Sequence, residues 1–239
     1  MIPFLVVLFA WFFQSITGFG AGIFIIGILS LLYDPKVVVV SSALFNLVGT
    51  LLLLYQNRNG KVDRYLLFSL VVGSVPGIFL GAQVLHHVDS ESLRLVIGTL
   101  IVLLGLYDLL VSKKRLELYF GRHWGMPIGF VGGFFAGLVG MGGPPPLVFL
   151  RQHLSDPCSI RLMLNLYFTS NIILRLTFYH QLQVVNLQWD FVLSGFLGLL
   201  LGVLLGSLLD RKLPEEFYRK SIPYWVMLLG FVLILLTEV

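Results

Sequence analysis

The sequence has little charge and almost no cysteine. Charged residues make up 12% of the 239 residues and hydrophobic residues 57%, a balance that soluble domains do not have. The longest polar connection, at residues 112–123, is too short to bury a core of its own, so a soluble domain is excluded. The single cysteine, Cys158, cannot form a disulfide within the chain.

Acidic residues are missing from the interior of every apolar run. Proton-coupled carriers often depend on such acids, so coupling to protons is not expected. No Gly-x-Ser-x-Gly elbow, His-Glu-x-x-His pair or buried carboxylate dyad is present, so the sequence does not predict an enzyme. The histidines have no ligand spacing, and no metal or other cofactor is predicted. Lysine and arginine lie in short loops between apolar runs, which argues against nucleic-acid binding.

Long apolar runs are what the sequence has instead. Runs above about 18 residues predict membrane-spanning helices, so we expect an all-α, multi-pass integral membrane protein with lipid as its surroundings. The first run lacks the positive flank of a cleavable signal peptide and is expected to be retained. The runs cover residues 3–32, 36–56, 65–86, 92–112, 124–150, 158–180, 188–209 and 217–237.

Two of these runs are interrupted by residues that disfavour helix. Gly137–Pro146 (GLVGMGGPPP) contains four glycines and three prolines, and Thr17–Gly22 (TGFGAG) is a softer copy near the start. Backbone that is broken at membrane depth must face protein or a water-filled cavity. Two broken helices in matching positions indicate the binding site of a transporter.

The two interruptions belong to an internal repeat. At an offset of 122 residues, Gly18 aligns with Gly140 and Asp34-Pro35 with Asp156-Pro157, and later glycines spaced by four align at an offset of 125. Each Asp-Pro pair supplies an N-cap followed by proline at the first helical position. We therefore expect two repeats of four helical segments, residues 1–116 and 117–239, each opening with a broken helix.

The distribution of positive charge tests two topologies. If all eight runs cross, seven lysines and arginines lie on one side and eight on the other, which gives no orientation. If the two broken runs are re-entrant, thirteen lie inside, only Lys36 and Arg94 lie outside, and Arg175 remains at membrane depth. The second topology makes the repeats inverted and puts both termini on the non-cytoplasmic side of the membrane. We expect that membrane to be a bacterial plasma membrane. A kinked 30-residue helix that crosses is the alternative.

Broken helices present backbone N–H groups and a positive dipole end, which together bind anions without a formal charge. The candidates for this cradle are Gly18, Gly20, Gly140, Gly142 and Gly143. Glycines that merely allow close helix crossings are the alternative interpretation.

Polar side chains inside apolar runs add to the candidate site. Asn46, Asn165 and Asn171 either donate to a bound oxyanion or join helices to one another. Arg175 is the one charge well inside a run; it either attracts an anion or extends to the membrane interface. Arg161 lies closer to a run end and is expected to be an interfacial anchor.

The Thr17–Gly22 motif, Asp34-Pro35 followed by Asn46, and the Gly137–Pro145 motif followed by Asn165 resemble the TauE/SafE-type sulfite exporter family over essentially the whole chain. The resemblance implies a permease for small sulfur-containing anions such as sulfite, thiosulfate or organosulfonates. Carried onto the motifs, it adds Thr17, Gly22 and Pro144 to the candidate substrate-binding residues. The second motif has three consecutive prolines, and the first motif has Ala21 at the position that matches Gly143. We therefore expect the two motifs to contribute unequally to the binding site.

The sequence thus favours an exporter that works by alternating access and is driven mainly by the membrane potential. An anion channel and an uptake permease for another small organic anion are the alternatives. The sequence leaves the oligomeric state open, a homo-oligomer included.

Overall fold

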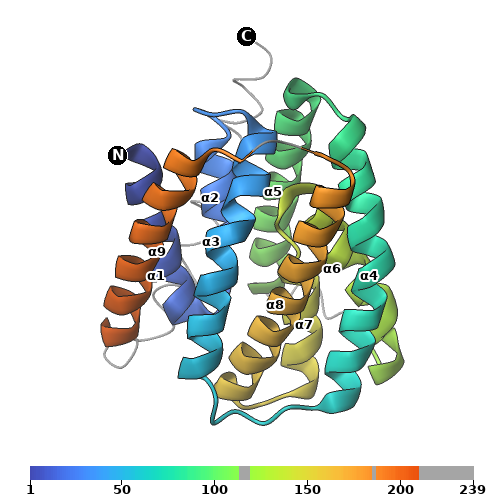
Figure 1. Ribbon diagram of the computed structural model, residues 1–239. Helices are drawn as coiled ribbons and strands as arrows, with labels where there is room; N and C mark the ends of the chain where they lie inside the picture. Colours follow the sequence, from blue (N-terminus) through green and yellow to red (C-terminus); the bar gives the residue numbers. More distant parts are fainter. Residues whose placement is uncertain (113–118, 185–186, 210–239) are drawn as a thin grey trace.

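The computed structural model describes residues 1–112, 119–184 and 187–209, and within these ranges the chain forms helices and no strand (Figure 1). The last predicted segment, 217–237, lies outside the described residues. The other predicted outer boundaries agree with the observed helices to within three residues. The elements are α1 (Ile2–Thr17), α2 (Ala21–Leu29), α3 (Pro35–Gln56), α4 (Arg64–His87), α5 (Ser90–Ser112), the 3-10 helix η1 (Arg122–Trp124), α6 (Gly125–Val139), α7 (Pro144–His153), α8 (Pro157–Gln181) and α9 (Trp189–Leu209).

Three of the described helices are long and apolar enough to cross a membrane: Pro35–Gln56, Arg64–His87 and Trp189–Leu208. The 25 residues of α8 are long enough as well, but its polar side chains keep α8 out of this set. Large apolar side chains remain exposed along these helices, among them Phe68, Phe79 and Leu204. Apolar surface of this kind is stable against lipid and not against water, so the chain is an all-helical membrane protein.

The predicted helix starts at Asp34-Pro35 and Asp156-Pro157 are confirmed. The side chain of Asp34 accepts hydrogen bonds from the first backbone N–H groups of α3, and Asp156 does the same for α8. Asp63 caps α4 in the same way and also forms an ion pair with Arg122, at 2.6 Å. Each aspartate therefore fixes where a long helix begins.

The two predicted helix breaks are observed as well. Gly18 and Gly20 separate α1 from α2 with φ angles of 85° and 111°, and Gly140 ends α6 with a φ of 78°. Only glycine adopts such angles without strain, which explains why both helices end at glycine. The N–H of Gly18 donates a hydrogen bond to the carbonyl of Gln14, and the N–H of Gly140 donates one to the carbonyl of Ala136.

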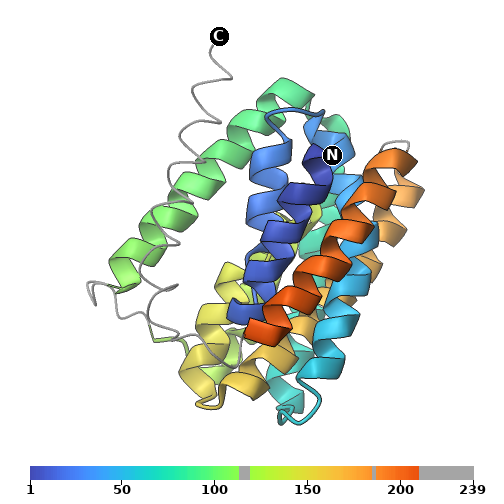
Figure 2. The same ribbon diagram turned by 90° about the vertical axis from the view of Figure 1, so that its left-hand side faces the viewer.

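The first broken helix begins and ends at the same end of the molecule (Figure 1). Arg94, at the start of α5, donates from Nε to the carbonyl of Ser30 just after α2, at 2.8 Å. The rings of Tyr33, after α2, and Phe191, at the start of α9, lie 5.6 Å apart, and α1 runs beside α9 in the same direction (Figure 2). The start of α1 and the end of α2 therefore lie together.

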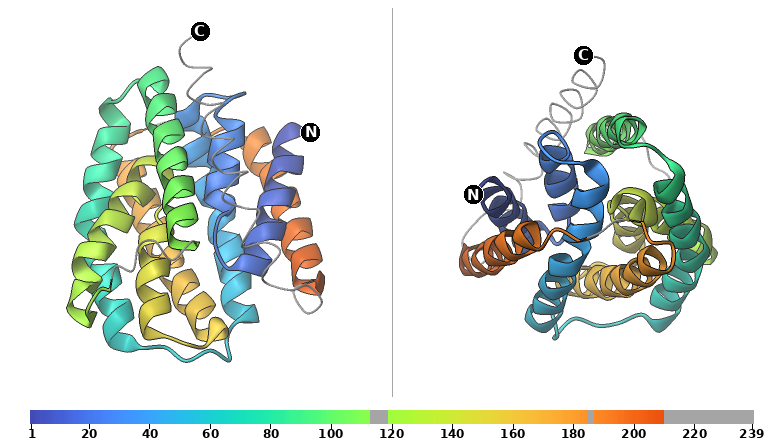
Figure 3. Two further views of the ribbon diagram at one scale, coloured as in Figure 1. Left: turned by 180° about the vertical axis from the view of Figure 1, so that it is seen from behind. Right: turned by 45° about the horizontal axis from the view of Figure 1, so that its top comes forward.

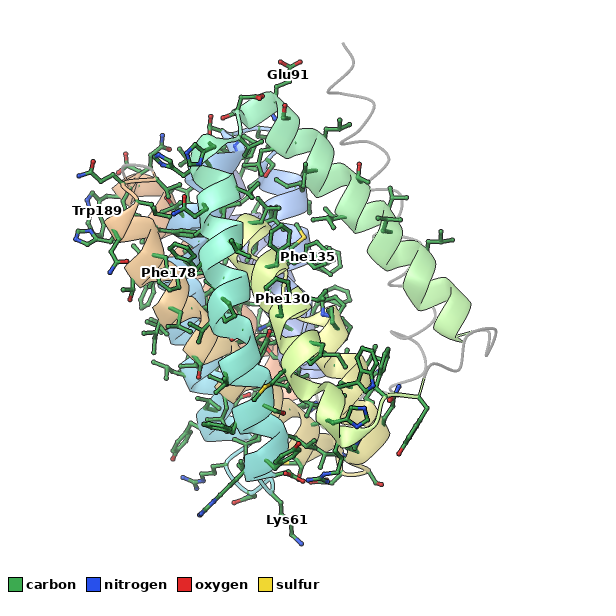
Figure 4. The ribbon with its side chains drawn as sticks, turned by 90° about the vertical axis from the view of Figure 1, so that its right-hand side faces the viewer. Lys61, Glu91, Phe130, Phe135, Phe178 and Trp189 are labelled. Atoms are coloured by element: carbon green, nitrogen blue, oxygen red, sulfur yellow. The ribbon has the colours of Figure 1, made fainter. Side chains whose placement is uncertain are left out.

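The second broken helix begins and ends at the opposite end. The ion pair between Arg122 and Asp63 places the start of α6 beside the start of α4, and the Gln152 side chain, in α7, accepts from the N–H of Phe120 at 2.9 Å. The Lys61 N–H donates to Ser159 Oγ at 2.8 Å, which brings the start of α8 to this end too. Figure 4 labels Lys61 and Glu91, which stand at the two ends of the molecule.

Matching glycine stripes pack α4 against α6 and α9 against α1, and these two helix pairs flank α3 and α8 (Figure 3). A Cβ added at any of the six glycines would lie between 2.1 and 2.7 Å from a backbone carbonyl of the partner helix, so no larger residue fits. Gly73, Gly77 and Gly81 of α4 face the carbonyls of Met126, Phe130 and Phe134, whereas Gly198, Gly202 and Gly206 of α9 face those of Phe4, Leu8 and Phe12. The same offsets of 125 and 122 residues relate the two sets.

The buried apolar side chains form two separate clusters. One cluster gathers residues of α1, α2, α3, α5 and α9, the last turns of α4 and α6, Met141 after the end of α6, and Tyr179 of α8. The other gathers residues of α4, α6, α7 and α8, and Phe19, which follows the end of α1, packs against it. Phe19 and Met141, one at each helix break, therefore both pack against helices of the other predicted repeat.

Candidate functional site

A cavity of about 70 Å³ lies where the two helix breaks meet. That volume is several times the roughly 10–15 Å³ that one water molecule needs. Its walls come from both breaks and from the middle of α3 and α8. They comprise Trp11, Gln14, Phe19, Gly20, Ala21, Gly22, Ile23, Asn46, Thr50, Ala136, Gly140, Met141, Gly142, Gly143, Pro144, Phe168, Asn171, Ile172 and Arg175.

The two breaks touch each other at this cavity. A Cβ added to Gly22, in the first turn of α2, would lie 2.9 Å from the carbonyl oxygen of Gly140, which ends α6. Only a glycine allows this approach without displacing the neighbouring backbone. By contrast, Gly20 has nothing within 4 Å of its missing Cβ, so its backbone borders open space.

Four backbone N–H groups at the breaks have no hydrogen-bond partner among the described residues: those of Gly20, Gly22, Gly142 and Gly143. Helix starts leave such donors, and they favour negative charge. The first turn of α7 has few backbone N–H donors, because its first three residues, starting at Pro144, are all proline. The expected inequality between the two motifs therefore has a physical form, the loss of N–H donors from α7.

Two asparagine side chains line the cavity, one from α3 and one from α8. Asn46 accepts a hydrogen bond from Trp11 Nε1 at 3.0 Å, which holds the oxygen and turns the amide nitrogen to the remaining space. Asn171 accepts from Ser74 Oγ at 2.8 Å, while its Nδ2 is buried and has no partner among the described residues. A buried donor without a partner is costly, and a ligand oxygen would remove that cost.

Arg175 places the only formal charge on the cavity wall, and the residue is only 3% exposed. Its Nη2 donates to the carbonyl of Val39 at 3.2 Å, its Nη1 lies beside Gly140, and its Nε has no partner among the described residues. The guanidinium carbon is 5.5 Å from the ring centre of Tyr179. The side chain therefore points inward and does not reach the membrane interface.

No carboxylate in the described part of the chain pairs with Arg175. An uncompensated buried charge costs several kcal/mol. The only other interactions available to it are carbonyl oxygens and an aromatic face, which are weaker partners than a carboxylate. An anion bound in the cavity would supply the counter-charge that the described residues do not.

Nine of the twelve predicted site residues line the cavity, and three do not. Thr17 caps its own break, with Oγ1 donating to the carbonyls of Phe13 and Phe19 at 2.9 and 2.7 Å. Gly18 packs against the side chain of Arg161. The third, Asn165, is fully buried and its Nδ2 donates to the carbonyl of Arg161 at 2.7 Å.

The expectation that Arg161 anchors the chain at the membrane interface stays a prediction, but the contacts of its side chain are defined. Its Nη2 donates to the carbonyl of Ile16 at 2.5 Å, at the end of α1. The guanidinium therefore satisfies an orphan carbonyl and opposes the negative end of the α1 dipole. The requirement arises from the tertiary position of α8 beside the first break, which no local pattern reveals.

Several wall residues were not in the predicted set. Thr50 follows Asn46 by four residues and Phe168 precedes Asn171 by three, so helical periodicity from a predicted residue would have found both. Gln14 accepts the N–H of Ala21 at 2.8 Å and so ties α1 to α2 across the break. Among the described residues no group of three histidine, cysteine or acidic side chains has the arrangement of a metal site.

Comparison with known proteins agrees with this architecture. Residues 3–233 match the family described as Sulfite exporter TauE/SafE. A curated relative from Cupriavidus necator, named "Probable sulfite/organosulfonate exporter TauE", is 30% identical over 172 residues. That match covers 70% of this chain and 66%, just under two thirds, of the relative. No solved structure matches. With broken helices around a buried cavity, and with a family match over nearly its whole length, the chain belongs to the TauE/SafE sulfite exporter family of membrane transporters.

Proposed function

We propose that this protein exports small sulfur-containing anions, such as sulfite, thiosulfate or organosulfonates, from the cell by alternating access at the cavity between the two helix breaks. The relative's printed name points to the same substrates. The observation that carries the proposal is the Arg175 guanidinium, buried on the cavity wall with no described carboxylate beside it.

The donors around the cavity suit an oxyanion. Arg175 offers a free Nε, Asn171 offers an unpartnered Nδ2, and the breaks add N–H groups at Gly20, Gly22 and Gly142. Charge-assisted hydrogen bonds to a sulfonate or sulfite oxygen are stronger than neutral ones, so the anion gains most at the arginine. Cations would meet the same fixed positive charge and be repelled.

An inverted repeat provides the movement. The first broken helix opens to one end of the molecule and the second to the other, and the two glycine-packed helix pairs correspond to each other at the repeat offsets. In carriers of this type one repeat rocks against the other around a fixed central site.

Positive charge supports an orientation in the plasma membrane. Lys36 and Arg94 lie at the end that carries the start of α1, whereas the opposite end carries most of the described positive side chains. We infer that the second end faces the cytoplasm, and that the N-terminus lies outside. The positive side chains assigned to the cytoplasmic end are Arg58, Lys61, Arg64, Arg122, Arg151 and Arg161.

The membrane potential supplies the driving force in this proposal. None of the described residues that line the cavity is acidic, so the described wall offers no carboxyl group for proton coupling. An inside-negative potential favours anion exit by roughly 2.3 kcal/mol per charge per 100 mV.

Reconstituted vesicles test the function. Vesicles loaded with sulfite, thiosulfate, sulfoacetate or taurine should take up the same labelled compound by counterflow, and the flux of the anions, but not of zwitterionic taurine, should follow a clamped potential. A channel would show no counterflow, and an uptake permease coupled to protons would follow a pH gradient at zero potential. Loss of both responses in every compound would refute the proposal.

A further inference from the structure

We propose that the cavity selects singly charged anions over doubly charged ones, and that Arg175 sets this selectivity. The inference rests on the proposed function and narrows it: hydrogensulfite and singly charged organosulfonates are preferred, whereas dianions such as the sulfite dianion, thiosulfate and sulfate are carried less readily. The starting observation is the charge inventory of the wall, in which one arginine is the only ionised side chain.

The helix dipoles add little to the net fixed charge at the cavity wall. The positive ends of α2 and α7 point at the breaks, but the negative ends of α1 and α6 end at the same breaks. Partial charges of opposite sign at one place largely cancel. The Arg161 guanidinium at the end of α1 is bound to the carbonyl of Ile16 and does not line the cavity, so Arg175 remains the one full charge that a described residue places on the wall.

Burial converts this single charge into a preference. The cost of moving an ion out of water rises with the square of its charge, so a dianion loses about four times the hydration free energy of a monoanion of the same size. Its attraction to one guanidinium rises only in proportion to the charge, by about twofold. With a single buried cation, the second negative charge adds more cost than attraction.

The other described wall residues add neutral donors but no second positive charge. Trp11, Phe19, Ile23 and Met141 present mostly apolar surface, and Trp11 has already used its N–H on Asn46. The prolines that open α7 remove N–H donors that another helix start would have supplied. An anion with one polar end and one apolar end, such as a short sulfonate, satisfies both parts of the wall.

Methanesulfonate and sulfate form a matched pair of probes, because both are tetrahedral, have nearly the same size and differ by one charge. In vesicles with the wild-type protein, methanesulfonate should inhibit counterflow of labelled sulfonate at a concentration at least about tenfold below that of sulfate. Equal inhibition, or stronger inhibition by sulfate, would overturn the charge selectivity and leave the export function intact. Failure of every anion to exchange would instead refute the proposed function, and this inference with it.

Sulfite gives an independent measurement, since raising the pH through neutrality converts hydrogensulfite to the dianion. Flux per total sulfite should fall with that conversion, while methanesulfonate flux, measured in parallel, stays level and controls for any effect of pH on the protein. A sulfite flux that stays level or rises would overturn the inference.

A second charge in the cavity should relax the preference. Ile172 lines the cavity and precedes Arg175 by three residues on α8, so Ile172→Lys adds a cation on nearly the same helix face. Sulfate should then compete better relative to methanesulfonate, whereas the control Ile172→Met should keep the wild-type ratio. An unchanged ratio in a folded, exchanging Ile172→Lys protein would count against a charge-based mechanism.

Discussion

Replacing Arg175 by glutamine removes the only charge on the cavity wall and keeps a polar side chain of similar reach. A monoanion in van der Waals contact with the guanidinium lies about 4 Å from its charge, where the attraction is about 4 kcal/mol at an effective dielectric constant near 20. Because each 1.4 kcal/mol is a factor of ten, Arg175→Gln should weaken substrate binding by about a thousandfold.

The same substitution should leave the empty protein at least as stable as the wild type. The buried guanidinium has no described carboxylate partner, so its removal relieves a desolvation cost and loses one hydrogen bond, to the carbonyl of Val39. Binding is measured by isothermal titration with methanesulfonate in detergent, and stability by thermal unfolding without ligand. These two readouts separate an anion-binding role from a structural one.

Arg175→Lys is the matched control, because it keeps the charge and loses the planar fork. We expect it to retain part of the affinity, between those of the wild type and Arg175→Gln. Wild-type affinity in Arg175→Gln would refute the reasoning. A large drop in its unfolding temperature would show instead that the arginine mainly supports the fold.

Three further perturbations test the architecture. Gly142→Leu should abolish transport while the protein still inserts, because a Cβ there would lie 2.3 Å from a backbone carbonyl of α6; flux combined with membrane-fraction quantification checks it, and retained flux would contradict it. Gly77→Leu should separate α4 from α6 and cost at least about 2 kcal/mol, since a Cβ would lie 2.2 Å from the carbonyl of Phe130; monodispersity on gel filtration equal to that of wild type would argue otherwise. Hydrogen bonds from Ser159 lower the pKa of Asp156, so its cap stabilises the fold above the ordinary carboxyl pKa and is lost as the pH falls through the lowered one. Asp156→Ala should therefore lower the unfolding temperature at neutral pH and have little effect in strong acid, and a pH-independent difference would contradict that assignment.

Much of the fold was predictable, because the length and hydrophobicity of an apolar run are enough to identify a membrane helix. The predicted apolar runs correspond to α3, α4, α5, α8 and α9, and the predicted interruptions correspond to the observed breaks at Gly18–Gly20 and Gly140–Gly143. The glycines spaced by four on α4 and α9 were part of the predicted internal repeat, and the structure adds which helix each one packs against.

The site was predictable only in part, because residue type does not report direction. Arg175 and Arg161 lie on one helix, and the sequence could not decide whether either reached the interface. In the structure Arg175 turns toward Gly140 and the cavity, whereas Arg161 turns toward the end of α1. Asn165 and Asn171 are likewise separated, the first bonded within α8 and the second on the cavity wall.

The sequence by itself determined three properties: that the chain is a membrane protein, at which residues its helices begin, and at which residues two of them break. These properties depend on local hydrophobicity and on the positions of glycine, proline and aspartate. Only the tertiary structure decided that Gly22 touches Gly140, that one arginine lies on the cavity wall and another does not, and that the cavity holds a single charge. Those properties depend on how helices distant in the chain pack together, and a continuously apolar sequence carries little periodic signal to specify it.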